Sequence, residues 1–152
     1  MSEEKRAQYE LVCQQVKSLA EGESNSIGLL ANVTALLRMT FGERFFWVGF
    51  YLVKDDELVL GPFQGDIACM HIGRGRGVCG TAWQQDATLI VPDVEQFPGH
   101  IACSSLSRSE IVVPLHDAEG KVTGVLDIDS KELAAFDTDD REGLEALCRE
   151  IR

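Results

Sequence analysis

Apolar residues recur at helical spacing in three stretches of the chain. The first predicts an amphipathic helix over residues 1–22, carrying Tyr9, Val12, Cys13, Val16, Leu19 and Ala20 on its apolar face. A second helix begins at Asn25 or Ser26, either of which suits the N-cap position, and stops near Gly42. The third, residues 138–152, has an apolar face made of Leu144, Leu147, Cys148 and Ile151. The pattern therefore predicts helices at both ends of the chain.

Between these helices, residues 45–130 show the alternation and the aromatic and β-branched content of strands. We expect strands at residues 45–53, 58–63, 69–72, 89–91, 109–116 and 121–130. A turn at residues 117–120 joins the last two strands into a hairpin, and a short helix follows the glycine-rich segment 73–80. By its size the chain is one domain. We predict a single α+β domain over residues 1–152, with a central, mostly antiparallel sheet flanked by N-terminal and C-terminal helices.

Charge narrows the classes of partner. With 14 Lys and Arg against 25 Asp and Glu, the formal net charge is -11 at pH 7, which repels phosphate backbones and argues against nucleic acid. No apolar run approaches the roughly 20 residues that a membrane span needs, and the charged first ten residues contain no apolar signal core. We therefore expect a cytoplasmic protein that binds neither nucleic acid nor membrane.

The five cysteines should be reduced in such a protein, so their positions decide what they do. Cys13 and Cys148 fall on apolar helix faces, which predicts small buried core residues. Cys69, Cys79 and Cys103 fall at a strand end, in a glycine-rich turn and in the long segment 92–108, where side chains can reach the rim of a pocket. Position alone leaves a shared reactive site and three unrelated thiols about equally open.

Two other kinds of site are disfavoured by spacing. The pattern C-x9-C-x23-C lacks the short paired spacings of structural zinc, so we expect no metal, and His71, His100 and His116 are expected at the surface or in the core. His100 could still assist the Cys103 thiolate. The segment GRGRGVCG departs from the dinucleotide fingerprint. Its glycines instead predict a tight turn beside a pocket, and no cofactor.

Acidic and aromatic side chains share strand faces. Asp127 and Asp129 are two residues apart in an otherwise apolar strand, and Glu110 lies on the facing hairpin strand. Trp47 and Tyr51 share one face of the first strand. If the acidic face is not simply solvated, its three carboxylates cannot all ionise easily, so at least one pKa should be raised. Such a cluster suits a cationic ligand or a proton donor.

Several longer segments now combine into a family resemblance. The segments FFWVGFYL, LGPFQGDIAC, GRGVCGTAW, VPDVEQFPGHIACSS, SEIVVPL and GVLDIDS, in this order, resemble the free methionine-(R)-sulfoxide reductases, which are stand-alone GAF domains. The tail SKELAAFDTDD also resembles the Asn-Lys-Phe-Asp-Glu signature of cyclic-nucleotide-binding GAF domains. Ser130 replaces the Asn, however, and Arg141 stands where a Glu is expected. That departure argues against cyclic-nucleotide sensing and leaves a single GAF domain as the implied fold.

The resemblance implies a role for each cysteine of the candidate site. Cys103 matches the nucleophile that removes oxygen from the substrate sulfur, Cys69 the resolving cysteine, and Cys79 an auxiliary or alternative resolver. The matching pocket residues are two aromatic residues that hold the methyl end of the sulfoxide, Trp47 and Tyr51, and three acids that bind substrate and polarise the sulfoxide, Glu110, Asp127 and Asp129. Helix N-termini lower thiol pKa values, so physical chemistry alone favours Cys79 as the nucleophile. The long family motif favours Cys103, which we adopt.

The implied activity is reduction of free L-methionine-(R)-sulfoxide to methionine. Cys103 becomes a sulfenic acid, Asp129 or Glu110 serves as the acid, Cys69 forms a disulfide, and thioredoxin reduces it. The R configuration comes from the resemblance alone. A GAF sensor that binds a small molecule, or a redox switch without turnover, remains the alternative. The first helix could pack on its own domain or on a second copy in a homodimer.

Overall fold

The computed structural model describes residues 2–100 and 106–151 of the chain. Its elements, in chain order, are α1 (Ser2–Ala20), α2 (Ser26–Phe41), the 3-10 helix η1 (Gly42–Arg44), β1 (Trp47–Lys54), β2 (Glu57–Gln64), β3 (His71–Gly73), α3 (Gly77–Gln85), β4 (Leu89–Val91), the 3-10 helix η2 (Val94–Gln96), β5 (Ser109–His116), β6 (Val122–Ser130) and α4 (Thr138–Arg149). The expected helices and strands are confirmed, whereas the two 3-10 helices were not predicted. Because β3 begins at His71, Cys69 lies in the loop before this strand and not inside it. None of these described helices is long and apolar enough to cross a membrane.

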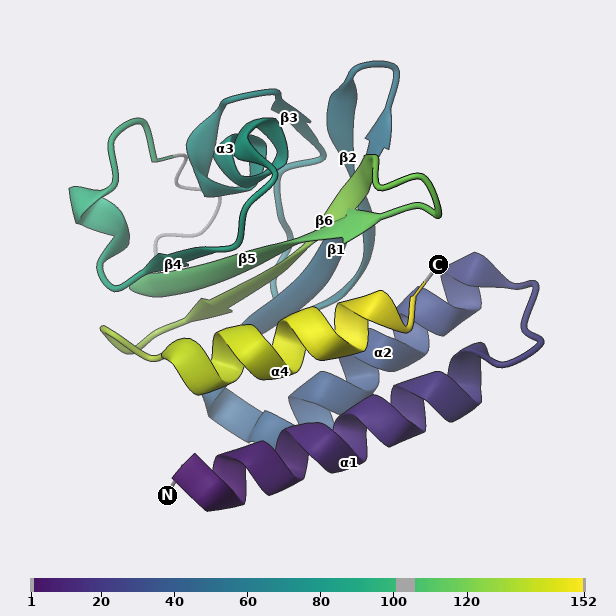
Figure 1. Cartoon of the computed structure of the whole chain (residues 1–152). Coiled ribbons are helices and arrows are strands. Elements are labelled where there is room, and N and C mark those ends of the chain that lie inside the picture. The colour runs from purple at the N-terminus through teal and green to yellow at the C-terminus, as the bar shows by residue number, and fades with distance from the viewer. Residues whose placement is uncertain (1, 101–105, 152) are drawn as a thin grey trace.

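The six described strands form one sheet in the order β3-β2-β1-β6-β5-β4. Every neighbouring pair is antiparallel, so the predicted mostly antiparallel sheet is confirmed. Helices α1, α2 and α4 cover one face of this sheet, and α3 lies over the other (Figure 1). The chain is therefore an α+β domain with two differently covered sheet faces.

The two faces belong to two separate cores, because successive side chains of a strand point to opposite sides. In β1, Val48 and Phe50 are buried in the core under α1, α2 and α4. Trp47 and Tyr51 are buried in the second core, under α3. The alternation expected for this strand is confirmed, and it assigns the functional candidates to the α3 face.

Helix α1 buries its apolar face within its own domain. Tyr9, Val12 and Val16 are buried in the core shared with α2, α4 and the sheet. Of the two alternatives for this helix, packing on its own domain is the one observed. Cys148 of α4 is buried in the same core and Cys13 packs partly buried against it, as predicted.

The GAF-like tail begins α4 with a capping box. The Asp137 side chain accepts hydrogen bonds from the backbone N–H groups of Asp139 and Asp140, and the Asp140 side chain accepts one from the backbone N–H of Asp137. Phe136, just before the cap, is buried in the core. These bonds satisfy N–H groups that a helix start leaves without a partner.

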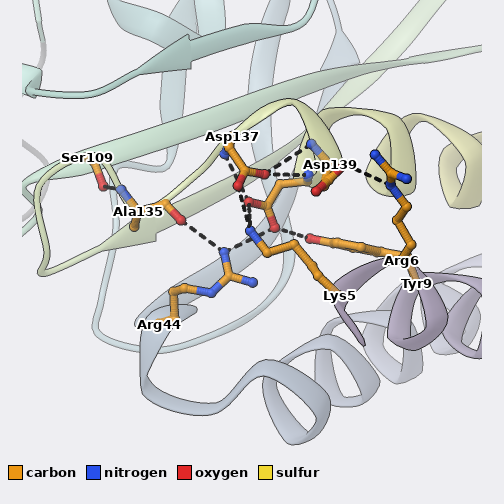
Figure 2. A network of polar contacts seen from close by, with 9 residues as sticks. Lys5, Arg6, Tyr9, Arg44, Ser109, Ala135, Asp137 and Asp139 are labelled. Atoms are coloured by element: carbon orange, nitrogen blue, oxygen red, sulfur yellow. Dashed lines mark hydrogen bonds and ion pairs between the residues drawn. The ribbon is translucent and has the colours of Figure 1, made fainter. Parts of the chain in front are cut away.

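Asp140 also ties α4 to the N-terminal helix and to η1. Figure 2 shows Lys5, Tyr9 and Arg44 of this network, which point toward the start of α4. Its fully buried carboxylate accepts hydrogen bonds from the Tyr9 hydroxyl at 2.6 Å, from Lys5 Nζ at 3.0 Å and from an Arg44 guanidinium nitrogen at 3.0 Å. Burial and this carboxylate together raise the pKa of Tyr9. The degenerate signature thus has a structural use in this chain, because it joins the two terminal helices.

Candidate active site

Three predicted site residues form one row across three adjacent strands. Trp47 on β1 pairs with Asp129 on β6, and Asp129 pairs with Glu110 on β5. In the next row Gly49 pairs with Asp127. Residues directly opposite each other in an antiparallel pair have Cβ atoms only about 5 Å apart. The strand register therefore brings together residues that are far apart in the chain.

Helix α3 places Cys79 above this row. The chain enters the helix with positive φ angles at Gly75 in the turn and at Gly77, the first residue of α3, which glycine adopts without strain. At Gly80 a Cβ would lie 2.4 Å from the Gly73 carbonyl oxygen, so the helix can approach the turn only because this residue is glycine. The resulting approach leaves Cys79 Sγ 4.0 Å from Glu110 Oε2. The interpretation of GRGRGVCG as a tight turn beside a pocket is confirmed.

A single cavity on this side joins most of the predicted site. Six predicted residues line it: Trp47, Tyr51, Cys79, Glu110, Asp127 and Asp129. Arg76 and Ser107 also line it and were not predicted. Ser107 donates a hydrogen bond from its hydroxyl to Asp129 Oδ1 at 3.2 Å. A serine in the long segment 92–108 gives no sequence signal for this contact. The position of the Arg76 side chain depends on the geometry of the turn, which the sequence pattern does not define.

The three carboxyl groups of the cavity differ in how they hold protons. Burial raises the pKa of Glu110 and of Asp129 well above the usual range, and repulsion from Asp127 adds to both shifts. Burial also raises the pKa of Asp127, but hydrogen bonds from Glu110 and Cys79 favour its ionised form. The expectation of at least one raised pKa is confirmed. Glu110 and Asp129 therefore hold their protons more tightly than Asp127 does.

Asp127 has an oxygen that lacks a partner. Its Oδ1 atom is buried and accepts no hydrogen bond among the described residues, although Asp127 is only 5% exposed. A buried acceptor without a donor is costly. A ligand that donates a hydrogen bond or carries a positive charge is therefore stabilised most when it binds at this oxygen.

Cys79 is not an activated thiol. Its pKa is raised well above the usual value, first by burial and then by the charges of Asp127 and Glu110. The expectation that the start of α3 lowers this pKa is wrong, because complete burial among carboxyl groups outweighs the modest field of a helix end. Physical chemistry therefore no longer favours Cys79 as the nucleophile.

The two predicted aromatic residues also position the loop that carries Cys69. The Trp47 indole N–H donates to the Asp66 carbonyl at 2.9 Å, and the Tyr51 hydroxyl donates to the Cys69 carbonyl at 2.9 Å. The two rings stack with their centroids 6.0 Å apart. The wall of the cavity and the position of the Cys69 backbone are thus coupled.

The described cysteines differ in their bonding. Cys69 is disulfide-bonded, whereas Cys13, Cys79 and Cys148 are free. Cys103, the predicted nucleophile, lies outside the described residues. The structure therefore places Cys69 and Cys79 of the three predicted reactive cysteines, the first in a loop tied to the cavity wall and the second in the lining of the cavity.

The three histidines lie in two different environments. His71 and His116 make exposed hydrogen bonds to Glu57 and Asp86. His100 lines the cavity, and burial lowers its pKa against the pull of a nearby carboxylate. It is therefore held towards the neutral form beside the acidic cluster.

Comparison with known proteins gives this arrangement its context. The family model described as GAF domain matches residues 26–152. GAF domain-containing protein A of Dictyostelium discoideum is 60% identical over 146 residues, covering 95% of this chain and 90% of the relative. The free methionine-R-sulfoxide reductase of Escherichia coli is 48% identical over 136 residues, covering 88% of this chain and 80% of the relative. The chain belongs to the GAF-domain family of free methionine-R-sulfoxide reductases.

Solved structures agree with this membership. The X-ray structure of free methionine-R-sulfoxide reductase from Neisseria meningitidis, in complex with its substrate, matches this GAF domain with a TM-score of 0.92 and 52% sequence identity. The match covers 97% of this chain and 87% of the other. The GAF fold implied by the sequence resemblance is confirmed.

Proposed function

We propose that this GAF domain reduces free L-methionine-(R)-sulfoxide to L-methionine. The observation that carries the proposal is the cavity, where Glu110 and Asp129, whose pKa values are raised well above the usual range, lie beside Asp127 with its unpartnered oxygen and beside two aromatic rings. Family membership and relatives named free methionine-R-sulfoxide reductase support it.

The cavity suits the parts of a free amino-acid sulfoxide. The ammonium group binds Asp127, whose Oδ1 atom lacks another partner among the described residues. The methyl end of the sulfoxide lies against Trp47 and Tyr51. Glu110 or Asp129, which burial keeps protonated, donates a hydrogen bond to the sulfoxide oxygen. A peptide-bound methionine sulfoxide has no ammonium group at this position, which explains a preference for the free amino acid.

The reaction needs only cysteine chemistry and a proton donor. The Cys103 thiolate attacks the sulfoxide sulfur, Glu110 or Asp129 supplies a proton to the oxygen, and the products are methionine and a Cys103 sulfenic acid. The Cys69 thiol then condenses with the sulfenic acid, releasing water and leaving a disulfide. That Cys69 is disulfide-bonded, and that its loop is held to the cavity wall by Tyr51, supports its role as the resolving residue.

A dithiol protein of the thioredoxin kind restores the thiols by disulfide exchange. Two large apolar side chains flank Cys69 in the loop before β3. Ile67 is 91% exposed and Met70 is 68% exposed. Exposed apolar side chains beside a disulfide offer a contact surface to the protein that reduces it.

Coupled turnover tests the proposal. With thioredoxin, thioredoxin reductase and NADPH, the chain should consume NADPH on the R diastereomer of free methionine sulfoxide and far less on a peptide-bound one. Cys103→Ser should abolish turnover and Cys69→Ser should limit it to one event, whereas Cys148→Ser, in the opposite core, should behave as wild type. Turnover of Cys103→Ser at the native rate contradicts the mechanism. A sensor without turnover would bind the sulfoxide and consume no NADPH.

A further inference from the structure

The proposed reaction leaves one buried thiol without a defined task. Cys79 lines the cavity from α3, is 4% exposed, and has surroundings that disfavour its thiolate. Burying a thiol among carboxyl groups is unfavourable for a nucleophile. The same arrangement suits a cationic ligand, because a cation can interact with the thiolate and the carboxylates at the same time.

The geometry around Cys79 is close to that of a three-ligand metal site. Cys79 Sγ, a carboxylate oxygen of Glu110 and one of Asp127 all lie within 4.8 Å of one another, and the sulfur lies 4.0 Å from Glu110 Oε2. In a tetrahedral zinc site with a sulfur at about 2.3 Å and an oxygen at about 2.0 Å, these two ligand atoms are about 3.5 Å apart. Shifts of side-chain torsions of these three residues can close the remaining gap.

A second observation points to a ligand at the same place. Asp127 is buried, and its Oδ1 atom has no hydrogen-bond partner among the described residues. Within the described lining of the cavity, the basic residues are Arg76 and His100. Arg76 is exposed at the rim, and His100 is held towards its neutral form. The described part of the cluster therefore contains no cation of its own.

We propose that Cys79, Glu110 and Asp127 bind a thiophilic divalent cation such as Zn²⁺, and that this ion inhibits the enzyme by excluding the substrate. The cavity leaves a fourth coordination position for water. An ammonium group gains little from a neighbouring thiol, whereas a zinc ion gains a strong ligand, so the thiol distinguishes the two cations. Zinc binds the thiolate and carboxylate forms of its ligands, so its binding releases protons.

The sequence argument against zinc does not apply to this site. That argument concerned closed structural sites, whose cysteines come in short paired spacings. The three ligands proposed here come from α3, β5 and β6 and meet only because the strands pair and α3 packs over them. The inhibitory part of the proposal rests on the proposed reductase function, whereas the binding part does not.

Titration of the oxidised protein tests binding without any turnover. The chain, with Cys69 in its disulfide as in the structure, is titrated with ZnCl₂ by calorimetry in buffer without chelator or reductant. We expect one zinc ion per chain, with an affinity that rises with pH. Co²⁺ should give the near-ultraviolet charge-transfer band of a thiolate ligand.

Matched variants decide whether the named residues are the ligands. Cys79→Ser should lose the cobalt band, and both Cys79→Ser and Asp127→Asn should bind zinc at least roughly tenfold more weakly. Cys13→Ser and Cys148→Ser, which remove the other two free thiols, should keep the band and the wild-type affinity. Thermal melts verify that each variant is folded. Absence of zinc binding in the wild type, or an unchanged band and affinity in Cys79→Ser, overturns the proposal.

Kinetics then separates the two proposals. Zinc should inhibit competitively with methionine sulfoxide, and Cys148→Ser should be inhibited as the wild type is. If zinc binds at Cys79 but the wild type has no reductase turnover, the metal site stands and the proposed function fails. Zinc inhibition that is not relieved by raising the sulfoxide concentration overturns the inhibitory part of this inference.

Discussion

Glu110 and Asp129 face each other across β5 and β6, and burial raises the pKa of both. Neither forms a salt bridge among the described residues. Because no such partner offsets the cost of ionising them, their protonated forms are favoured. Two adjacent acids with raised pKa values are suited to donate a proton to a leaving oxygen. They also link the stability of the fold to pH.

Glu110→Gln should change this pH dependence in a defined direction. The folded protein binds the Glu110 proton more tightly than the unfolded chain, whose glutamate has a pKa of about 4.3. The stability that this proton contributes is therefore lost as pH rises from about 4.3 towards the raised pKa of the folded state. The free energy of unfolding of the variant, relative to the wild type, should increase with pH in denaturant titrations. A difference that does not vary with pH would contradict the assignment.

Asp140→Asn should destabilise the fold without touching the cavity. The change leaves Lys5 and Arg44 without the buried charge that they share, and breaking such a pair costs about 3–5 kcal/mol. Asp139→Asn is the matched control, because its partner Arg6 has a side chain that is 62% exposed, and such pairs contribute under about 1 kcal/mol. Chemical denaturation compares the two. Equal losses would show that the Asp140 network is not the stronger connection.

Gly49→Ala should disturb substrate binding through Trp47. A Cβ at position 49 would lie 2.6 Å from the Trp47 indole and 2.4 Å from Phe63 Cβ, so the indole must move. We expect KM for methionine sulfoxide to rise roughly tenfold, about 1.4 kcal/mol of binding. In a Trp83→Phe background Trp47 is the single tryptophan of the chain, and its fluorescence reports the displacement. An unchanged emission spectrum and KM would mean that the ring position does not depend on this glycine.

Met70→Ser should weaken the reaction with thioredoxin and leave the reaction with a small dithiol unaffected. Met70 is 68% exposed beside Cys69, whereas Met39, 80% exposed on α2, serves as the control position. We expect the thioredoxin concentration needed for half-maximal turnover to rise severalfold in Met70→Ser and to stay at the wild-type value in Met39→Ser. Both variants should turn over normally with dithiothreitol. An identical thioredoxin dependence in the two variants removes Met70 from the contact.

The sequence predicted what depends on local periodicity. The alternation in β6 correctly grouped Asp127 with Asp129, and the turn after His116 correctly paired that strand with the one carrying Glu110. The alternation in β1 likewise grouped Trp47 with Tyr51. These relationships repeat every second residue within one strand or follow from one short turn, so they can be seen without knowing the rest of the fold.

Relationships between elements could not be seen in this way. Nothing in the sequence near Cys79 indicates that α3 packs over Glu110, and the pKa of this thiol depends on that packing rather than on its helix position. The bond from Trp47 to the Asp66 carbonyl and the contact from Ser107 to Asp129 also cross between elements. Each depends on how a loop closes over the sheet, which involves side-chain packing from both partners.

Side chains of β6 alternate between the two faces of the sheet. The strand is therefore sensitive to insertions and deletions in a way that substitutions do not reveal. Leu126 and Ile128 lie in one core, and Asp127 lines the cavity on the opposite face. One inserted or deleted codon between Val122 and Leu126 would exchange the two sets, placing carboxylates under α1 and α4 and leucine and isoleucine in the cavity. An insertion of two codons would keep each side chain on its original face of the sheet. The strand should therefore tolerate insertions of an even number of residues far better than insertions of an odd number.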